Sequence, residues 1–318
     1  MTRYLFGPVP SRRLGRSLGV DLVPFKTCSY DCIYCQLGPT TCRTIERKEW
    51  VPLERVLAEL PERLASKPDY ITLSGSGEPT LYSRLDELIA RIKALTDVPV
   101  AVLTNGSLLW QADLRRQLRQ ADLVVPSVDA GDEAMFQRVN RPHPELSFDT
   151  MLEGLVALRQ EFPAAYWLEV MVVGGFTDTQ AEIEKLAACV DRIQPERVQL
   201  NTVTRPPAEA AATTVSAERL GQFAALFRPA AEVIADFRHV HQQAEFVASR
   251  NEVLALLERR PCSVGDIAGG LGMHDNEVVK YLEELRVAGA VECLPGEGKQ
   301  YYRSIAAHPT AANESLSD

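Results

Sequence analysis

The 318-residue chain has no apolar run long enough to cross a bilayer, and its first residues, MTRYLFGPVPSRR, lack the apolar segment of a secretory signal. These absences predict a cytoplasmic protein without a membrane partner. Positive charge is also scarce, because 34 Lys and Arg residues stand against 43 Asp and Glu residues, a net charge of −9. A general attraction to nucleic acid is therefore excluded, and any such binding requires a local basic patch.

The cysteines do not form the pattern of a disulfide framework. There are seven, an odd number, and three of them lie within one short segment. This usage favours reduced thiols in a reducing compartment. Cys189, Cys262 and Cys293 are isolated in apolar surroundings, and we expect them to be small core residues.

The sequence has no P-loop, because no Gly-Lys-Ser or Gly-Lys-Thr precedes a predicted helix. The segment GPVPSRRLGRSLG instead places Arg12, Arg13 and Arg16 close together. Their guanidinium groups could hold an anionic substrate or a cofactor carboxylate, and the alternative is a solvated charged loop. The same two interpretations apply to Arg141-Pro142-His143 and to Arg205-Pro206-Pro207.

The segment TCSYDCIYCQ sets Cys28, Cys32 and Cys35 in a Cys-x3-Cys-x2-Cys spacing. Three thiolates this close together can bind three corners of one cubane [4Fe–4S] cluster, whose ligation a fourth cysteine would ordinarily complete. One iron is then open to a small ligand. A structural zinc site is the alternative, but it requires four Cys or His ligands, and Cys42 is the nearby candidate for the fourth.

From Ser17 onward, short apolar runs alternate with amphipathic stretches, the pattern of repeated βα units. The runs are nearly continuous in apolar residues, as expected for a parallel sheet covered on both faces. Six such units are too few for a complete (β/α)8 barrel, so the sequence predicts an α/β fold, a partial and open (β/α)6 barrel. The predicted strands are 18–23, 70–74, 98–104, 123–128, 167–173 and 197–201, and the predicted helices are 52–65, 83–95, 111–120, 150–161, 179–193 and 217–227.

Glycine and polar residues follow each predicted strand, and in barrels of this kind the chemistry gathers at the C-terminal ends of the strands. The SGSGEPT turn after the second strand has two glycines that let backbone approach a ligand, and Glu78 can accept hydrogen bonds from an ammonium group. The alternative is an ordinary turn with Glu78 favoured by the helix dipole. On the same rim, Asn105 could hydrogen-bond ligand hydroxyls, although Asn-Gly is also a common turn dipeptide. Ser127, Asp129 and Asn201 could contact a ligand or equally satisfy neighbouring backbone, and the glycines of the turn 174–176 are consistent with backbone approaching a ligand.

The cysteine spacing, with the aromatic Tyr34 before the last cysteine, resembles the signature of radical S-adenosylmethionine (SAM) enzymes. The resemblance implies that SAM binds the open iron, and that one electron from the cluster cleaves SAM to a 5′-deoxyadenosyl radical. A low-potential donor such as flavodoxin or ferredoxin supplies that electron. The implied SAM contacts are Gly75, Ser76, Gly77 and Glu78 to the amino group, Ser127, Asp129 and Asn201 to the carboxylate and ribose, Asn105 to ligand hydroxyls, and Tyr34 stacked on the adenine.

The motifs GPVPSRR, CSYDCIYCQLG, SGSGEPTL and RPH together resemble bacterial radical SAM proteins related to tRNA wyosine-base (4-demethylwyosine) synthases. The resemblance covers the first two thirds of the chain. Those synthases act on a guanosine-derived ring and use a second cluster, whereas this sequence has no second trio of cysteines. An RNA base, a peptide and a small metabolite all remain open as the substrate.

The C-terminal part has a separate pattern. Three short amphipathic helices, 252–259, 264–271 and 275–288, precede a predicted hairpin, which resembles a winged helix-turn-helix domain. The third helix is acidic, so we expect protein docking or substrate presentation rather than binding to duplex DNA. The predicted organisation is a radical SAM core over 1–228, a linker over 229–249, a winged-helix domain over 250–304 and a disordered tail over 305–318.

Three functions follow from these features. The first is a radical SAM enzyme with an unidentified substrate. The second is an iron–sulfur or SAM-sensing transcriptional regulator that uses the winged domain. The third is a zinc-stabilised scaffold. His239 and His241 are spaced like one face of a strand, but without a third ligand nearby we expect them not to bind a metal.

Overall fold

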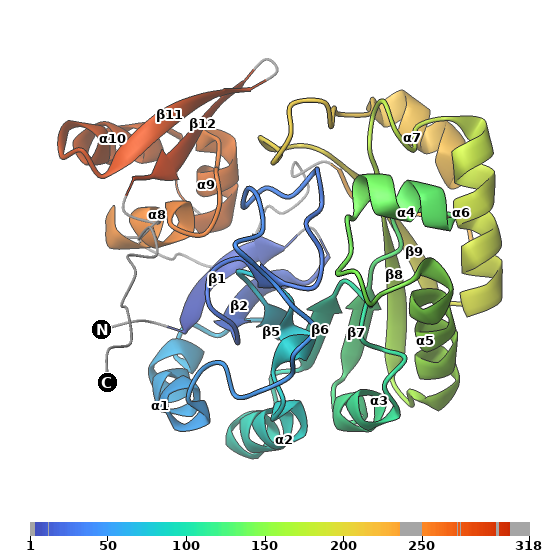
Figure 1. The fold of residues 1–318 in the computed structure, drawn as a ribbon. Coiled ribbons are helices and arrows are strands. Elements are labelled where there is room, and N and C mark those ends of the chain that lie inside the picture. The colour runs from blue at the N-terminus through green and yellow to red at the C-terminus, as the bar shows by residue number, and fades with distance from the viewer. Residues whose placement is uncertain are drawn as a thin grey trace, which may run out of the picture. The chain divides into compact units, whose positions relative to one another are not determined.

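The computed structural model describes residues 4–11, 13–235, 250–271, 273, 275–296 and 299–305. Figure 1 shows the elements in chain order. The chain divides into two units, 1–240 and 241–318, and each is considered by itself. His239 and His241 lie outside the described residues, as do residues 306–318 of the predicted tail.

The first unit is built on one eight-stranded sheet in the order β1-β2-β5-β6-β7-β8-β9-β10. From β2 to β10 all neighbouring strands are parallel, whereas β1 pairs with β2 in the antiparallel sense. The predicted α/β class and its mostly parallel sheet are therefore confirmed. The strands are β1 Leu5–Ser11, β2 Gly15–Asp21, β5 Tyr70–Ser74, β6 Val100–Thr104, β7 Leu123–Pro126, β8 Ala165–Val172, β9 Arg197–Thr202 and β10 Glu232–Val233.

All six predicted helices of this unit are present, with ends that differ by a few residues. A further helix that the sequence pattern did not predict, α4, lies between β7 and α5. The helices are α1 Leu53–Leu64, α2 Leu85–Leu95, α3 Ala112–Leu118, α4 Glu133–Val139, α5 Phe148–Glu161, α6 Gln180–Ile193 and α7 Ala217–Ala224, with a 3-10 turn η1 at Pro79–Leu81.

Side-chain caps define where several helices begin. Asp132, Ser147, Thr179 and Ser216 each accept a hydrogen bond from the backbone N–H three residues later. These short polar side chains satisfy amides that would otherwise lack a partner at the first helical turn. The caps therefore define the residues at which α4, α5 and α6 begin after the chain has left the sheet.

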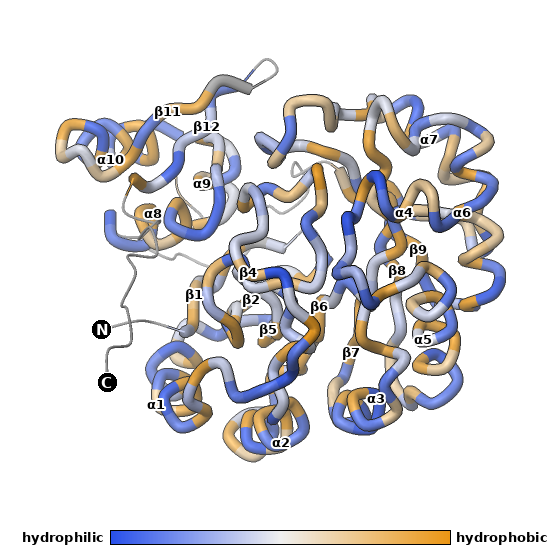
Figure 2. The backbone as a smooth tube through the Cα atoms, in the orientation of Figure 1, coloured by the Kyte–Doolittle hydropathy of each residue, from blue (hydrophilic) through white to orange (hydrophobic). Residues whose placement is uncertain are grey.

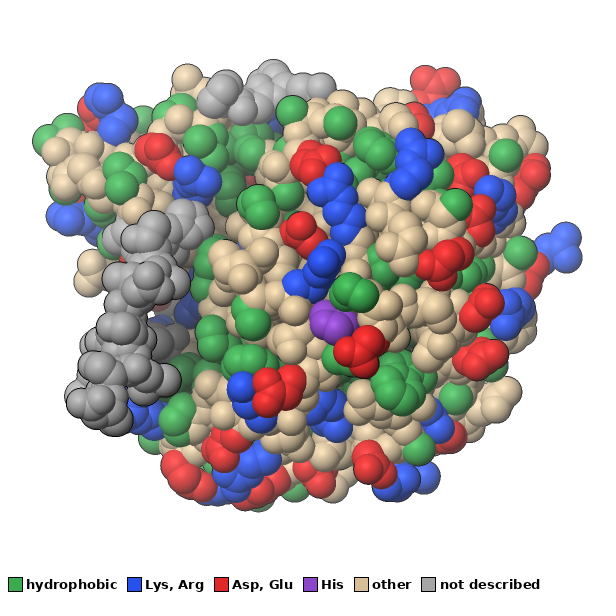
Figure 3. Space-filling model, viewed as in Figure 1, with side chains coloured by type: hydrophobic (Ala, Val, Ile, Leu, Met, Phe, Trp, Pro, Cys, Tyr) green, Lys and Arg blue, Asp and Glu red, His purple; other side chains and the backbone are tan. Residues whose placement is uncertain are grey.

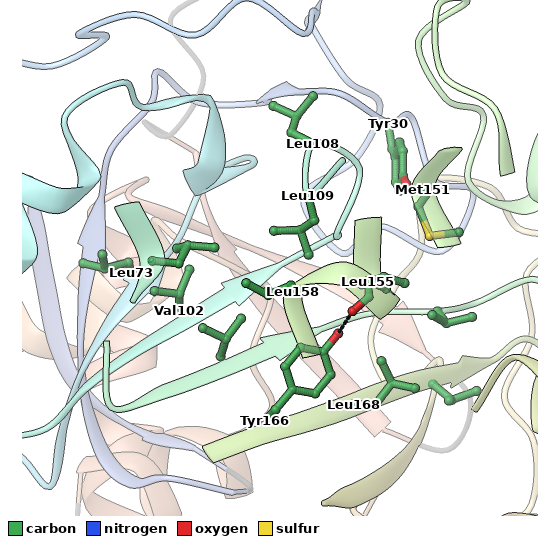
Figure 4. Close-up of a cluster of buried hydrophobic side chains, with 14 of the residues drawn as sticks. Tyr30, Leu73, Val102, Leu108, Leu109, Met151, Leu155, Leu158, Tyr166 and Leu168 are labelled. Atoms are coloured by element: carbon green, nitrogen blue, oxygen red, sulfur yellow. Dashed lines mark hydrogen bonds between the residues drawn. The ribbon is translucent and has the colours of Figure 1, made fainter. Parts of the chain in front are cut away.

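The core fills the space between the sheet and the helices. Along β8, Tyr166, Leu168 and Val170 are fully buried and alternate with half-buried residues, as the two-residue period of a strand requires. The hydroxyl of Tyr166 donates a hydrogen bond to the backbone carbonyl of Leu155 in α5 at 3.2 Å (Figure 4). The Tyr166 face of β8 is thus the helix-facing side, and the opposite face is called the inner face below.

Apolar side chains also gather at one level of the inner face. Leu14, Ala101, Leu123 and Val125 are buried together, and Trp167 packs against them. In Figure 2 the orange segments of β6 and β7 show how continuously apolar these buried strands are. Such strands need cover on both faces, and this cluster supplies part of it on the inner side.

In the described part of the second unit, three helices are followed by a two-stranded antiparallel hairpin. These elements match the predicted order of segments, while the winged-helix assignment and the domain boundaries stay predictions. Cys262 is buried, as expected, but Cys293 is exposed, because its place on the hairpin strand β11 turns its side chain outward. The elements are α8 Arg250–Leu257, α9 Val264–Leu271, α10 Asp275–Val287, β11 Val291–Gly296 and β12 Lys299–Ser304.

The surface carries both signs of charge. In Figure 3 acidic and basic side chains are interspersed over the visible face rather than separated into large fields of one sign. Among the residues that the structure describes, no helix has the length and apolar character needed to cross a membrane.

Candidate functional site

The three motif cysteines lie on one loop after β2, residues 27–38, called the cluster loop here. Cys28, Cys32 and Cys35 are all half-buried, whereas Cys42 is exposed. Two short parallel strands, β3 Thr27–Cys28 and β4 Cys42–Arg43, pair so that Cys42 lies opposite Thr27 and Arg43 lies opposite Cys28. Because successive residues of a strand point to opposite faces, Cys42 faces away from the side on which Cys28 lies.

Each of the three sulfurs receives a nitrogen donor from a different part of the barrel. Lys26 Nζ lies 3.1 Å from Cys35 Sγ. The side-chain amide nitrogens of Asn105 and Asn140 lie 3.6 Å from the sulfurs of Cys28 and Cys32, respectively. Sulfur atoms with several nearby N–H donors are typical of iron–sulfur sites, where hydrogen bonds to the ligands tune the cluster.

Burial makes the thiols of Cys28 and Cys32 hard to ionise unless a cation is bound. It raises the pKa of Cys28 to about 12, with the charge of Glu78 adding to the effect. The pKa of Cys32 is also raised, first by burial and then by the neighbouring Cys28. A metal centre would reverse this balance, since it binds thiolates and supplies the positive charge that stabilises them. The donor set therefore fits a [4Fe–4S] cluster.

A single zinc ion does not fit the same residues. Within the described ranges, no group of three or more His, Cys, Asp or Glu side chains is placed to hold one metal ion. Zinc requires ligands that converge to about 2.0–2.3 Å from one point. Three cysteines that bind separate irons of a cubane do not need to converge in this way.

The two glycines of the turn after β5 make room for the protein's own chain. Gly75 has φ +111°, and a Cβ there would lie 1.9 Å from Asp21 Oδ1. A Cβ on Gly77 would lie 1.9 Å from the backbone carbonyl of Thr27. The turn is thus pressed against the cluster loop, and Ser76 completes the contact by accepting a 2.6 Å hydrogen bond from the N–H of Lys26 at its carbonyl. These two glycines therefore position the cluster loop, in addition to any ligand that binds there.

Glu78 joins two turns of the rim. Its carboxylate is buried and accepts hydrogen bonds from Thr80 N at 3.0 Å, Thr80 Oγ1 at 2.5 Å, Thr104 Oγ1 at 2.6 Å and Asn105 N at 2.8 Å. Burial raises the pKa of Glu78, while these hydrogen bonds lower it. The carboxylate that the sequence assigned to an ammonium group is therefore already bound to four donors of the protein, and it fixes the Asn105 turn against the turn after β5.

Asn105, in the turn after β6, connects the C-terminal edge of the sheet to the cluster loop through its side chain. Its Nδ2 lies 2.9 Å from Ser29 Oγ, and its Oδ1 accepts from Ser107 N at 3.0 Å. The hydroxyls of Ser29 and Ser107 are hydrogen-bonded at 2.6 Å. The amide that the sequence predicted to contact a ligand hydroxyl thus lies directly beside the first cysteine.

Tyr34 and Asp129 form a hydrogen-bonded pair at the end of β7. The hydroxyl of Tyr34 donates to Asp129 Oδ2, and Asn140 Nδ2 donates to the same oxygen at 2.9 Å. The other oxygen of Asp129 accepts from Met171 N at 3.0 Å. Burial raises the pKa of Asp129 to about 6 against the lowering effect of these bonds. Asn140, which the sequence analysis did not single out, connects this pair to Cys32.

Asn201 belongs to a polar layer on the inner face. Its Nδ2 donates to Glu169 Oε1 at 2.8 Å, and Glu169 is ion-paired with Arg13 from the turn between β1 and β2. Arg13 Nη1 also donates to Gln199 Oε1 at 3.2 Å. Ser127, predicted to contact SAM, lies opposite Glu169 on the neighbouring strand. The structure thus brings Arg13, Ser127 and Asn201 together around Glu169 of β8.

The arginines before β2 separate into different environments. Arg13 is nearly buried, with 11% of its side chain exposed, so the solvated-loop interpretation is wrong for this residue. Arg16 lies in the strand β2, where its backbone N–H donates to Asp69 at 2.6 Å. Arg12 lies outside the described residues.

Replacement of Arg13 by alanine is expected to destabilise the protein by about 3 kcal/mol, because Glu169 would lose its buried cationic partner. The double variant Arg13→Met/Glu169→Leu should lose less free energy of unfolding than the sum of the losses in Arg13→Met and Glu169→Leu. The reason is that the double variant leaves neither charged side chain buried without its partner. Urea unfolding of the four proteins measures this. Additive losses would show that the pair contributes no coupling.

Two further segments support the cluster loop. The backbone carbonyls of Asn140 and Arg141 both accept from Asp31 N, at 3.0 and 3.1 Å, and His143 N donates to Ser29 O at 2.8 Å. The backbone N–H of Glu209 donates to Ile33 O at 2.9 Å, and the carboxylate of Glu209 forms an ion pair with Arg141. Arg205 Nη1 donates to Gln36 Oε1 at 3.1 Å. The segments of Arg141 and Arg205, for which the sequence allowed two interpretations, therefore both lie against the cluster loop.

Comparisons with known proteins agree with this geometry. The profile described as Radical SAM superfamily matches residues 22–190. Over 288 residues the chain is 35% identical to a UPF0026 protein of Helicobacter pylori, covering 88% of this chain and 91% of that protein. Over 295 residues it is 38% identical to a Brachyspira hyodysenteriae protein named GTPase Obg, covering 91% of this chain. The chain spans 43% of that relative's length.

Solved structures agree in fold. A radical SAM methyltransferase from Sphaerobacter thermophilus superposes with a TM-score of 0.54 at 19% identity, covering 70% of this chain and 67% of that one. At this level of identity the likeness concerns the fold alone. Together with the family profile and the Helicobacter pylori relative, the site shows that the chain belongs to the radical SAM superfamily and, within it, to the UPF0026 proteins.

Proposed function

We propose that this protein cleaves SAM reductively at a [4Fe–4S] cluster held by Cys28, Cys32 and Cys35, and uses the resulting 5′-deoxyadenosyl radical to activate a substrate on the inner face of the barrel. Members of the superfamily use this cluster and SAM as cofactors. The observation that carries the proposal is the loop itself, on which the half-buried Cys28 and Cys35 lie close enough to Cys32 for their charges to act on it, whereas the exposed Cys42 faces away from Cys28. When bound, the cluster supplies the electron for SAM cleavage.

The rim residues supply the proposed SAM site. The turn of Gly75, Ser76 and Gly77 lies against the cluster loop and offers backbone groups to the amino end of SAM, while Glu78 holds this turn to Asn105. Ser127 and Asp129 follow β7, and Asn201 lies near the end of β9, with β8 between the two strands. All three residues are at the C-terminal edge of the sheet and are proposed to contact the carboxylate and ribose. Tyr34 is proposed to lie against the adenine while its hydroxyl stays bonded to Asp129.

The regulator and GTPase interpretations have less support. The comparisons do not support an iron–sulfur or SAM-sensing regulator, and the sequence lacks a P-loop, so the GTPase name of the Brachyspira relative is not carried over to this chain. In α10, Arg286 is ion-paired with Glu283, and Asp275, Glu277 and Glu284 add further negative charge. We propose protein docking or substrate presentation for the second unit, because such a helix would repel DNA phosphates.

The electron donor is proposed to be flavodoxin or ferredoxin, which dock close to the cluster. Arg43 lies opposite Cys28 in the short parallel pair, and its Nη1 donates to the carbonyl of Arg141 at 3.4 Å. The guanidinium group of Arg43 places positive charge beside the cluster loop of an otherwise acidic chain, whereas Arg141 is ion-paired with Glu209. Charge complementarity of this kind steers an acidic partner and raises the rate of encounter.

The direct test of the proposed reaction is production of 5′-deoxyadenosine. The full-length protein, reconstituted anaerobically with iron and sulfide, is treated with dithionite and SAM, and the products are measured by mass spectrometry. We expect 5′-deoxyadenosine to form in the wild-type protein and not in Cys32→Ala. An intact cluster that releases no 5′-deoxyadenosine would contradict the proposal.

The motif resemblance leads us to propose an RNA base as the substrate class. RNA isolated from a strain that lacks this gene would be added to the same reaction, with RNA from the parent strain as the control. We expect the first RNA to increase the yield of 5′-deoxyadenosine and to gain a new nucleoside mass after digestion. Equal yields with both RNAs, and no new nucleoside, would redirect the search to peptides and small metabolites.

A further inference from the structure

Three side chains place a nitrogen donor beside the cysteine sulfurs of the cluster loop. They come from separate segments: Lys26 directly precedes the cluster loop, Asn105 lies in the turn after β6, and Asn140 lies at the end of α4. Each lies beside a different cysteine sulfur. Asn105 Nδ2 and Asn140 Nδ2 also donate to Ser29 Oγ and Asp129 Oδ2, both at 2.9 Å, so the contact of Lys26 with Cys35 carries most of the inference.

We propose that Lys26, Asn105 and Asn140 set the reduction potential of the cluster by each donating a hydrogen bond to one ligand sulfur, with Lys26 contributing most because it is charged. The inference rests on the proposed function, since it requires a cluster at the three cysteines. It goes further by assigning these side chains the role of positioning residues that act on the cluster through its ligands.

The backbone fixes the position of the Lys26 ammonium. Its φ of +59° is in the left-handed region, which a side chain as large as lysine rarely adopts. Hydrogen bonds on both sides hold this conformation, because Lys26 N donates to Ser76 O at 2.6 Å and Lys26 O accepts from Thr41 N and Cys42 N, both at 3.2 Å. The residue as a whole is only 3% exposed.

A lysine this deeply buried needs an anionic partner. Its ammonium lies 3.1 Å from Cys35 Sγ. A neutral thiol is a weak acceptor for an ammonium group, whereas the thiolate of a metal-bound cysteine is a strong one. The position of Lys26 is therefore best explained if Cys35 carries negative charge, as it does when it binds iron.

The direction of the effect follows from electrostatics. Reduction adds one negative charge to the cluster, so a nearby ammonium stabilises the reduced form more than the oxidised form and raises the potential. Asn105 and Asn140 act in the same direction, but their donors are neutral and lie farther from the sulfurs, at 3.6 Å. Their individual effects should be smaller than that of Lys26.

The test is the midpoint potential of the reconstituted full-length protein without SAM, measured by redox titration with EPR detection of the reduced cluster. Lys26→Met is expected to lower the ratio of reduced to oxidised cluster at a fixed potential at least tenfold, which equals 59 mV for a one-electron couple. Lys26→Arg should retain most of the wild-type potential. Lys67→Met is a matched control, because Lys67 also has a positive φ, +51°, but is exposed and lies after α1.

An unchanged potential in Lys26→Met would overturn the proposal, and so would a change shared with Lys67→Met. Weaker SAM binding at an unchanged potential would assign Lys26 to the SAM site instead and would also overturn it. If Lys26→Met fails to fold or to hold the cluster, Asn140→Leu provides the measurement, with a smaller shift in the same direction expected. Failure of the proposed function is distinguishable, since the wild-type protein would then lack a cluster or release no 5′-deoxyadenosine.

Discussion

Replacement of Cys32 by alanine is expected to abolish the iron–sulfur cluster and, with it, all SAM cleavage. The same result is expected for Cys28→Ala and Cys35→Ala, because two remaining thiolates on a short loop cannot hold a cubane whose fourth iron has no protein ligand. Iron and sulfide content and the visible absorption of anaerobically reconstituted protein measure the loss. Far-ultraviolet circular dichroism should show that the sheet and helices are retained.

Cys42→Ala is the matched control for these variants. It removes a neighbouring thiol that is exposed and lies opposite Thr27 rather than Cys28. The cluster content of this variant should equal that of the wild-type protein. Loss of the cluster in Cys42→Ala alone would mean that four cysteines complete the ligation and that no iron is open.

Glu78→Ala is expected to destabilise the protein by about 3 kcal/mol and to abolish SAM binding. The change leaves buried donors of Thr80, Thr104 and Asn105 without an acceptor, and each unsatisfied group costs about 1–3 kcal/mol. It also releases the Asn105 turn from the turn after β5, so the rim is no longer held in place for SAM. Urea unfolding and calorimetric titration with SAM measure the two effects.

Glu62→Ala is the control for the alanine substitution, because Glu62 is an exposed residue of α1, and its loss should change the free energy of unfolding by less than about 0.5 kcal/mol. Glu78→Gln keeps the shape and one acceptor oxygen, so its loss of stability should be smaller than that of Glu78→Ala. Full SAM affinity in Glu78→Ala would show that the four hydrogen bonds have no role in forming the SAM site.

The strands of the barrel were predictable because each is a nearly continuous apolar run that ends in a polar or glycine-containing turn. Tyr70–Ser74 was predicted at both ends. The antiparallel strand β1 was missed because its sequence, LFGPVPS, contains two prolines and a glycine, which argue against a strand. An edge position tolerates them, since β1 has a single strand neighbour, β2.

The site was predictable where its residues are close in sequence. The cluster loop could be recognised from the sequence because the Cys-x3-Cys-x2-Cys spacing of Cys28, Cys32 and Cys35 lies within one short segment. The contact of Asn140 with Cys32 joins residues 108 positions apart, and that of Arg13 with Glu169 joins residues 156 apart. Contacts of this kind depend on how the strands are ordered in the sheet, and a single sequence carries no local signal for them.

The glycines of the turn after β5 illustrate the same limit. The sequence correctly indicated that backbone must approach something closely at Gly77, but it could not identify the neighbour. In the structure that neighbour is the carbonyl of Thr27, next to the first cysteine. A substitution at Gly77 would therefore disturb the cysteine loop as well as the proposed SAM site.

The open iron is the central claim, and electron–nuclear double resonance on the reduced protein tests it most directly. SAM labelled with ¹⁷O in its carboxylate or ¹⁵N in its amino group is added to the reconstituted wild-type protein at low temperature. We expect hyperfine coupling from both labels to the cluster, because SAM would occupy the iron that the three cysteines leave free. Absence of both couplings from a protein with an intact cluster and bound SAM would contradict the account.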